Sequence, residues 1–446
     1  MLRVVTMLFG LASVLAAADG FVPWGRPKSP ASTPQAKPAV RTEAAAGPVA
    51  LTKSADGQWK LSRGGKPYEI RGIGGSVELA MAAEAGANSI RTWGSDAAPR
   101  LLPEAGKLGM TVTVGFWLSH NAADYTNQGY MDRIRDEVRR TVAAHAKDPA
   151  LLIWALGNET NAGADTDEAW KFIGELAVLC KQLDPGHPVM TVQAHPGPAT
   201  LDRMARLAPA VDIIGVNSYG GLTYWPDLLA RSAFAGPFIV TEWGPNGHWE
   251  VPKTPWGAPV EQTSSEKAKI FAERYAFIIS QKPRCLGSYV FLWGQKQERT
   301  PTWYSMFVET APTVGLTGEA TPTVDAMTLA WSGRTPANRA PVIGSFTIDG
   351  KQVREVRVNH PFVARIDATD PDKDRLEWRF EVMFEATQLG NGGSRETRPG
   401  HVDDAVVGSG GEAKVTVAKP GNYRLFAYVL DGKGKVATAN LPFQVY

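Results

Sequence analysis

Cysteine and histidine are scarce in this chain. Its 446 residues include two cysteines and seven histidines, and no two of the histidines form an H-x-H pair. The lack of such a pair disfavours a barrel hydrolase that depends on a bound metal, and we expect neither a metal nor an organic cofactor. Cys180 and Cys285 fall in different predicted strand–helix units, so we expect two free, mostly buried thiols rather than a disulfide.

An excess of charge of either sign is also missing. The chain has 47 basic and 45 acidic residues, a net charge of +2, which argues against a nucleic-acid partner and against a polybasic membrane surface. Tryptophan, by contrast, is abundant, with 14 residues. The flat apolar face of an indole suits the C–H face of a sugar ring, although we expect about half of these side chains to be ordinary core residues.

One apolar run stands apart from the others, at the N-terminus. Arg3 precedes VVTMLFGLASVLAAA, a stretch too short for a confident membrane span, which ends in small residues. Residues 1–18 therefore resemble a signal peptide, and we expect an exported protein, periplasmic or extracellular, with no stable membrane insertion once the signal is removed. An uncleaved anchor is the alternative. Residues 19–48 are rich in Pro and Ala and predict a disordered tether.

Apolar runs of strand length recur at regular intervals after residue 49. Eight of them read as buried parallel strands: 68–75, 88–94, 111–118, 151–159, 188–195, 211–220, 237–244 and 285–294. Helical periodicity marks segments between and after them: 77–86, 131–146, 168–184, 265–281 and 323–333. Eight strand–helix units over residues 49–334 predict a (β/α)8 TIM barrel, an α/β fold. The alternative, an open doubly wound sheet, is disfavoured because no G-x-G-x-x-G follows the first strand.

The pattern changes near Pro336. Residues 335–341 (TPANRAP) form a linker, and residues 342–446 alternate apolar and polar positions between D-G and P-G turns. This segment predicts a small all-β sandwich, immunoglobulin-like or cadherin-like. One stretch resembles the calcium-linking acidic run of cadherin-like repeats, although we favour a solvated acidic turn because further ligands are missing; its acidic residues are Asp367, Asp370, Asp372 and Asp374.

Two glutamates each end one of the apolar runs. Glu159 closes LLIWALGNE and Glu242 closes PFIVTE. The carboxyl ends of barrel strands share one rim, so these side chains can face each other across a pocket, as cleavage of a glycosidic bond requires. A carboxyl group that delivers a proton near neutral pH must be partly desolvated or lie near a second carboxylate. The alternative for Asn158-Glu159 is a helix cap.

Arg91 ends the predicted strand NSIRTWG. Burying an arginine at such a position costs free energy unless an acidic group pairs with it. We therefore expect Arg91 to meet Glu242 and to keep its carboxylate ionised. A surface salt bridge is the alternative.

Taken together, LLIWALGNE, PFIVTEWG and NSIRTWG resemble glycoside hydrolase clan A. They are most similar to the catalytic barrel of glycoside hydrolase family 2 and, next, to fungal β-1,3-glucanosyltransferases, over residues 50–333. The resemblance implies that Glu159 is the acid/base, Glu242 the nucleophile and Asn158 a ligand of the sugar 2-hydroxyl. It also implies a tyrosine beside the nucleophile and a tryptophan platform under the sugar, which would be Tyr219 and Trp293. Further candidate substrate-binding residues are Trp93, Trp117, His120, Gln193, His195, Trp249 and Trp303.

For several of these candidates a structural role is the alternative. The histidines can be core or surface residues, and Trp249 and Trp303 can build acceptor subsites or only pack loops against the barrel. The resemblance implies a retaining β-glycoside hydrolase or transglycosylase with two carboxyl groups about 5–5.5 Å apart. We expect an oligosaccharide or polysaccharide substrate, a β-glucan or a related polymer.

The domain order departs from that of family 2. Its members usually carry a sugar-binding sandwich and an immunoglobulin-like domain before the barrel, whereas this chain has a tether before the barrel and a sandwich after it. Exo-acting β-galactosidase or β-glucuronidase specificity is therefore not expected. The alternative from another functional class is a non-catalytic carbohydrate-binding or adhesion protein on a barrel scaffold.

Overall fold

The computed structural model describes residues 47–352, 354–390 and 396–446. The predicted signal peptide and most of the predicted tether lie outside the described residues. Among the helices that are described, none combines the length and the hydropathy that a membrane span requires.

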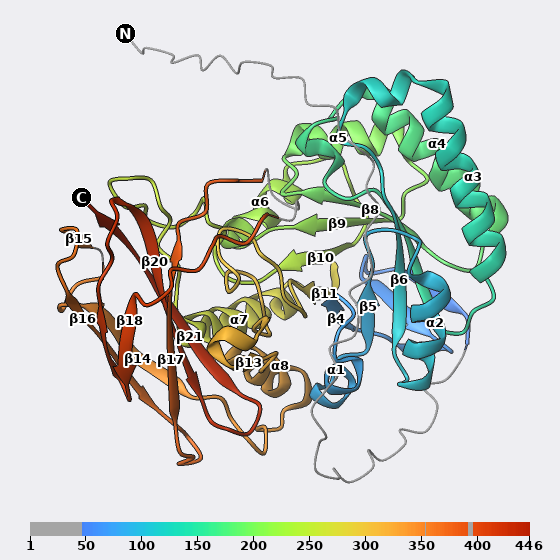
Figure 1. The fold of residues 1–446 in the computed structure, drawn as a ribbon. Coiled ribbons are helices and arrows are strands. Elements are labelled where there is room, and N and C mark those ends of the chain that lie inside the picture. The colour runs from blue at the N-terminus through green and yellow to red at the C-terminus, as the bar shows by residue number, and fades with distance from the viewer. Residues whose placement is uncertain (1–46, 353, 391–395) are drawn as a thin grey trace. The chain divides into compact units, whose positions relative to one another are not determined.

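A closed barrel of parallel strands forms the first part of the described chain (Figure 1). Its eight strands are β4 (Ile70–Gly74), β5 (Ser89–Arg91), β6 (Thr111–Phe116), β7 (Leu151–Leu156), β8 (Val189–Ala194), β9 (Ile213–Asn217), β10 (Phe238–Trp243) and β11 (Cys285–Val290). Each strand lies inside one predicted apolar run, and β11 pairs with β4 to close the ring. The predicted TIM barrel is confirmed.

Helices surround the strands of the barrel (Figure 1). They are α1 (Leu79–Ala85), α2 (Ala98–Lys107), α3 (Gln128–His145), α4 (Asp167–Leu183), α5 (Pro198–Leu207), α6 (Trp225–Ala230), α7 (Ser264–Ser280) and α8 (Pro322–Ser332), with short 3-10 turns at η1 (Ala122–Thr126), η2 (Thr160–Ala162), η3 (Gly220–Tyr224) and η4 (Pro312–Val314). Sequence periodicity identified five of these helices and missed α2, α5 and α6. All three are short, and each carries a proline in its first turn, where the missing N–H needs no partner.

The barrel has two apolar layers. The larger lies between strands and helices, and a smaller one joins side chains of β4 and of β7 to β11 with those of an N-terminal hairpin. The hairpin strands are β1 (Val49–Lys53) and β2 (Trp59–Arg63), followed by the short β3 (Lys66–Pro67). Because this smaller cluster takes in no helix residue, it fills the inside of the barrel, as side-chain layers do in this fold.

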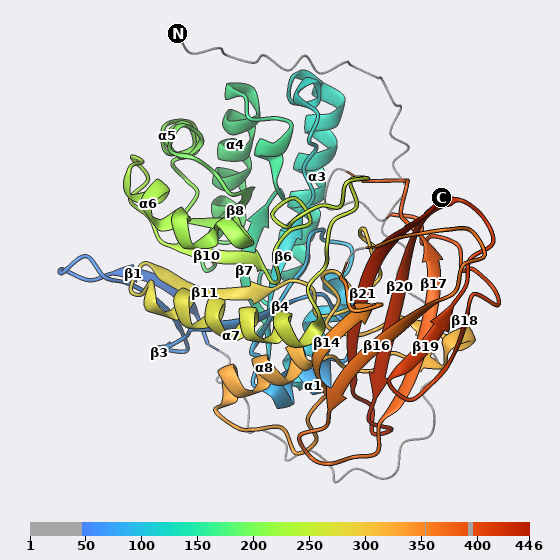
Figure 2. The same ribbon diagram turned by 90° about the vertical axis from the view of Figure 1, so that its left-hand side faces the viewer.

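The second part of the described chain is a sandwich of two four-stranded sheets, which Figure 2 shows face to face. One sheet has the order β14 (Val342–Ile348), β16 (Phe362–Thr369), β19 (Glu412–Val415), β18 (Val406–Ser409); the other has the order β15 (Arg354–Val356), β21 (Val436–Val445), β20 (Gly421–Leu430), β17 (Glu377–Phe384). The hairpin of β12 (Thr310–Ala311) and β13 (Leu316–Thr317) precedes α8. The predicted all-β domain is confirmed. Both cysteines are buried and unpaired, as predicted.

Close packing inside the barrel generates a test of its rigidity. A Cβ at Gly72 would lie 2.1 Å from the Tyr289 ring, which hydrogen bonds from its hydroxyl to Ser89 and Thr113 hold in place. We expect Gly72→Ala to lower the free energy of unfolding by about 1–3 kcal/mol, the usual cost of overpacking a core. Urea denaturation followed by circular dichroism measures it.

The matched control is Gly106→Ala on α2. A Cβ there meets only the Ala150 methyl group, at 3.7 Å. This change should leave stability unchanged or raise it by up to about 1 kcal/mol, because alanine favours a helix interior. Equal effects of the two substitutions would show that Tyr289 moves freely and would contradict the prediction.

Candidate active site

The predicted chemistry-bearing residues lie at the carboxyl ends of the barrel strands. Arg91 is the last residue of β5, and Glu242 is the last but one of β10. Glu159 follows the end of β7 by three residues. All barrel strands run parallel, so these ends form one rim, the usual place of the active site in a TIM barrel.

Three hydrogen-bond donors converge on the Glu242 carboxylate. Arg91 donates from its guanidinium to Oε1 at 2.9 Å, Trp93 donates from its indole N–H to the same oxygen at 2.7 Å, and the Tyr219 hydroxyl donates to Oε2 at 3.2 Å. Arg91 and Glu242 are both buried. The positive charge of Arg91 and the polar N–H of Trp93, both directed at Oε1, offset the free energy that burial of the negative charge would otherwise cost. The predicted meeting of Arg91 with Glu242 is present.

Arg91 also ties the two glutamate-bearing segments together. It donates to the Thr241 carbonyl at 3.0 Å and to Asn158 Oδ1 at 2.6 Å. Asn158 stands next to Glu159, so one buried guanidinium holds the strand end of β10 and the turn after β7 at fixed positions. This arrangement is not that of an exposed salt bridge.

Glu159 has a different environment. Its backbone is left-handed, with φ of 54°, and its N–H donates to the Val192 carbonyl, which anchors the turn on β8. Its side chain remains partly exposed and accepts a hydrogen bond from the Asn217 amide at 3.0 Å. Desolvation of the carboxyl group, together with the negative charge of Glu242, raises the pKa of Glu159 to about 7. A carboxyl group with this pKa is protonated in part of the molecules at neutral pH.

Asn217 belongs to the site, although sequence reasoning did not single it out. Its amide also donates to Asn158 Oδ1 at 3.1 Å, and its own Oδ1 accepts from the Thr241 hydroxyl at 2.8 Å. The side chain therefore sits between both glutamate-bearing segments. An amide at the end of the otherwise apolar run IIGVN was a signal that could have identified it.

The prediction that Trp293 forms the aromatic platform under the sugar is wrong. Trp293 is fully buried, donates its indole N–H to the Val77 carbonyl at 3.0 Å and packs against Phe307 and Trp331 in the outer core, so no sugar can stack on it. Phe291 stands in the site instead. Its ring lies edge-on to Trp93 and to Tyr219, with centroids 5.9 and 6.3 Å apart.

Two further residues that were predicted to bind the substrate have structural roles instead. Gln193 is fully buried; its carbonyl oxygen accepts from the Thr160 hydroxyl and from the Asn161 N–H, so its side chain supports the turn after Glu159. Trp303 is buried as well and donates to the Asn246 carbonyl at 2.9 Å. Neither presents a surface to a sugar.

The remaining predicted residues are more accessible. Trp117 and Trp249 expose 47% and 54% of their surface, and Trp249 lies edge-on to Tyr219, with centroids 5.7 Å apart. His120 donates from Nε2 to the Asn158 carbonyl at 2.6 Å, so its ring contacts the backbone of the residue next to Glu159. His195 is exposed, and its Nδ1 lies 2.8 Å from the Ser218 hydroxyl; desolvation of the part of the ring that is covered lowers the pKa of His195.

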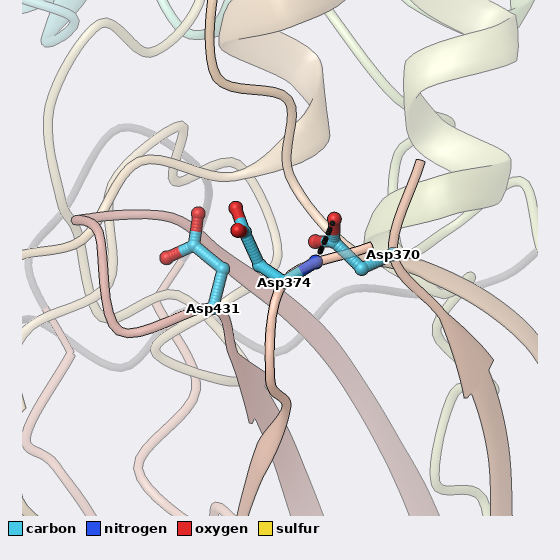
Figure 3. A group of neighbouring side chains, drawn as sticks. All are labelled: Asp370, Asp374 and Asp431. Atoms are coloured by element: carbon cyan, nitrogen blue, oxygen red, sulfur yellow. Dashed lines mark hydrogen bonds between the residues drawn. The ribbon is translucent and has the colours of Figure 1, made fainter. Parts of the chain in front are cut away.

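One group of acidic side chains in the sandwich could hold a cation. Each of Asp370, Asp374 and Asp431 offers one carboxylate oxygen, and these oxygens lie within 4.8 Å of one another (Figure 3). The Lys433 ammonium already pairs with Asp374 at 2.5 Å and supplies positive charge there. Of the other residues in the predicted acidic run, Asp372 pairs with Arg339. The cluster belongs to the sandwich.

Comparison with known proteins identifies the type of barrel. Residues 84–244 match the model of the glycosyl hydrolases family 2 TIM barrel domain. An 84-residue stretch is 27% identical to mannan endo-1,4-beta-mannosidase F of Aspergillus clavatus, which covers 19% of each chain.

Solved structures of similar fold include a beta-glucuronidase of Bacteroides uniformis, at 16% identity and a TM-score of 0.48, with 89% of this chain and 48% of that chain covered. An endo-beta-1,4-mannanase of Thermotoga petrophila aligns at 14% identity and a TM-score of 0.41, over 86% of this chain and 99% of that chain. The chain spans about a fifth of the length of the curated relative and about half of that glucuronidase. The matched segment runs from α1 to the end of β10 and holds both glutamates, so the resemblance to a glycoside hydrolase clan A barrel that the motifs predicted is confirmed.

Proposed function

We propose that this protein is a retaining β-glycoside hydrolase or transglycosylase that works by double displacement with Glu159 and Glu242. The observation that carries the proposal is the contrast between the two carboxyl groups. Glu242 accepts three hydrogen bonds, one of them from a buried arginine, whereas Glu159 accepts one from an amide and has its pKa raised to about 7. Environments that separate two carboxyl groups in this way assign one as nucleophile and the other as acid/base.

In the first step, Glu242 attacks the anomeric carbon, and the bond from that carbon to the glycosidic oxygen breaks. Glu159 gives its proton to the departing oxygen. In the second step, the Glu159 carboxylate takes a proton from the acceptor, whose oxygen attacks the same carbon and releases Glu242. Water as acceptor gives hydrolysis, and a sugar hydroxyl gives transfer. Two inversions leave the anomeric configuration unchanged.

For the substrate, we propose a β-linked polysaccharide, a β-glucan or a β-mannan. Trp117 and Trp249 offer exposed indole faces beside the site, which suits several sugar units in a row rather than a single one. The stretch shared with a mannan endo-1,4-β-mannosidase adds mannan to the glucan that the motifs suggested. Such a substrate fits an exported enzyme, as the N-terminal sequence indicates.

A panel of β-glucans, β-mannans and aryl β-glycosides tests the function, with products followed by mass spectrometry and by NMR of the anomeric centre. We expect cleavage with retained configuration for the wild type. Glu242→Gln should lose activity on every substrate by at least about 10³-fold, because the nucleophile is gone. Glu159→Gln should lose most on polymers and least on aryl glycosides with acidic leaving groups, which need no protonation.

Inverted products would contradict the double displacement. Binding of a polymer by wild type and Glu242→Gln alike, with no cleavage by either, would establish the non-catalytic carbohydrate-binding protein instead.

The raised pKa of Glu159 predicts the alkaline side of the pH profile. Below about pH 7 the group is protonated and can act as an acid; as the pH rises through about 7 it loses the proton, and kcat/KM should fall. Folding stability has the same sign, because a carboxyl whose folded pKa is raised loses stability as pH rises from its unfolded value of 4.5 through about 7.

The measurement is kcat/KM against pH for an aryl glycoside with a poor leaving group. Glu159→Gln, assayed with an activated aryl glycoside, is the control and should lack this alkaline limb. An alkaline limb near pH 5 in the wild type would show that Glu159 is not held protonated.

A further inference from the structure

Two loops beside the site rest on the sandwich. Loop A, residues 244–263, follows β10, and loop B, residues 291–309, follows β11. Arg424 of β20 donates to the Pro259 carbonyl in loop A at 2.9 Å, and the Glu396 carboxylate accepts from the Arg299 N–H in loop B at 2.5 Å. Arg424 and Glu396 are both buried, so these contacts are shielded from solvent.

Asn440 of β21 touches both loops at once. Its amide donates to Glu261 Oε2 in loop A at 2.6 Å and lies 3.3 Å from the Thr302 hydroxyl of loop B. Its Oδ1 accepts from Arg424 at 2.7 Å, which fixes the direction of the amide. Asn440 and Glu261 are 4% and 6% exposed. A buried carboxylate that loses a donor is penalised, so this amide is not replaceable by an apolar group.

Loop B and α7 supply the other partners of the Glu261 carboxylate. The hydroxyls of Thr300 and Thr302 donate to the carboxylate at 2.5 and 2.9 Å, and the ammonium of Lys267, from α7, pairs with it. Glu261 is thus the point where loop A, loop B and the sandwich are joined.

The contacts continue from this junction to the site. Trp303 follows Thr302 and donates to the Asn246 carbonyl of loop A. Its ring lies edge-on to His248, which in turn lies edge-on to Trp249, with centroids 6.1 and 4.8 Å apart. Trp249 packs against Tyr219, the residue that donates to Glu242. Every step in this series is a packed or hydrogen-bonded contact between described residues.

We infer that Asn440 is a positioning residue: from the sandwich it holds loops A and B so that Trp249 stands where a polysaccharide passes the nucleophile. The inference rests on the proposed function. Asn440 itself touches no substrate and acts through Glu261 and Thr302. The sandwich is in this view part of the substrate site of the barrel, because the position of an exposed indole depends on it. A small aryl glycoside, which fills only the sugar position next to Glu242, should not sense the change.

The test compares Asn440→Leu with Gln444→Leu. Gln444 lies on the same strand, but its amide donates to Asn422 within the sandwich, 2.8 Å away, so its loss should leave loops A and B in place. For Asn440→Leu we expect kcat/KM on the polysaccharide to fall about tenfold, mainly through KM, with a change of less than about twofold on the aryl glycoside. Thr302→Val removes the same junction from the barrel side and should behave alike, which covers the case that Asn440→Leu does not fold.

A double-mutant cycle with Trp249→Ala decides between positioning and general destabilisation. Once Trp249 is removed, Asn440→Leu should add less than about twofold on the polysaccharide, because the two residues act through one series of contacts. Additive losses, equal losses on both substrates, or equal effects of Asn440→Leu and Gln444→Leu would overturn the inference while leaving the proposed function in place. A wild type with no glycosidase activity would refute the proposed function and the inference with it.

Discussion

A buried guanidinium is the constraint on which the site depends. Arg91 is 1% exposed, and an arginine so placed needs a partner for its charge and acceptors for its donors. Both terminal nitrogens have acceptors, whereas Nε has none among the described residues. The acceptors come from two places: the Thr241 carbonyl and Glu242 on β10, and Asn158 after β7. Because the cost of an unpaired buried charge amounts to several kcal/mol, the ends of these strands cannot drift apart. The mutual placement of the two glutamates follows from this pairing.

The same pairing gives the two carboxyl groups different environments. The guanidinium and two further donors meet at Glu242, whereas the hydrogen bond that Glu159 accepts comes from a neutral amide. The charge of Arg91 also lowers the pKa of Glu159, but by less than desolvation and Glu242 raise it. Desolvation and the charge of Glu242 then dominate, and they raise the pKa of Glu159. Two identical side chains therefore differ in the proton affinity of their surroundings because of the number of donors that each receives, which is the difference that the proposed double displacement requires.

The sequence predicted the elements better than the directions of side chains. Eight apolar runs located all barrel strands, because burial on both faces leaves a strong signal. The residue at which a strand ends is harder to predict, and the choice of Trp293 as platform was wrong for this reason. Because β11 ends at Val290, the aromatic residue that reaches the site is Phe291, whereas Trp293 in the same motif points into the outer core. Gln193 shows a second limit. Whether an amide binds sugar or supports a turn depends on the neighbouring Thr160 and Asn161, not on its own strand.

Contacts between remote segments leave no local pattern at all. Asn440 and Glu261 are 179 positions apart in the chain, and each reads alone as an ordinary polar residue. Folding buries them together with the hydroxyls of loop B, and a buried polar group is tolerated only where all its partners arrive. Such a network has little tolerance for movement, since every displaced partner leaves an unsatisfied group behind. A sandwich joined to a barrel by apolar packing alone could slide or rotate by small amounts, whereas one joined through a buried carboxylate is held in a single register relative to the loops around Glu242.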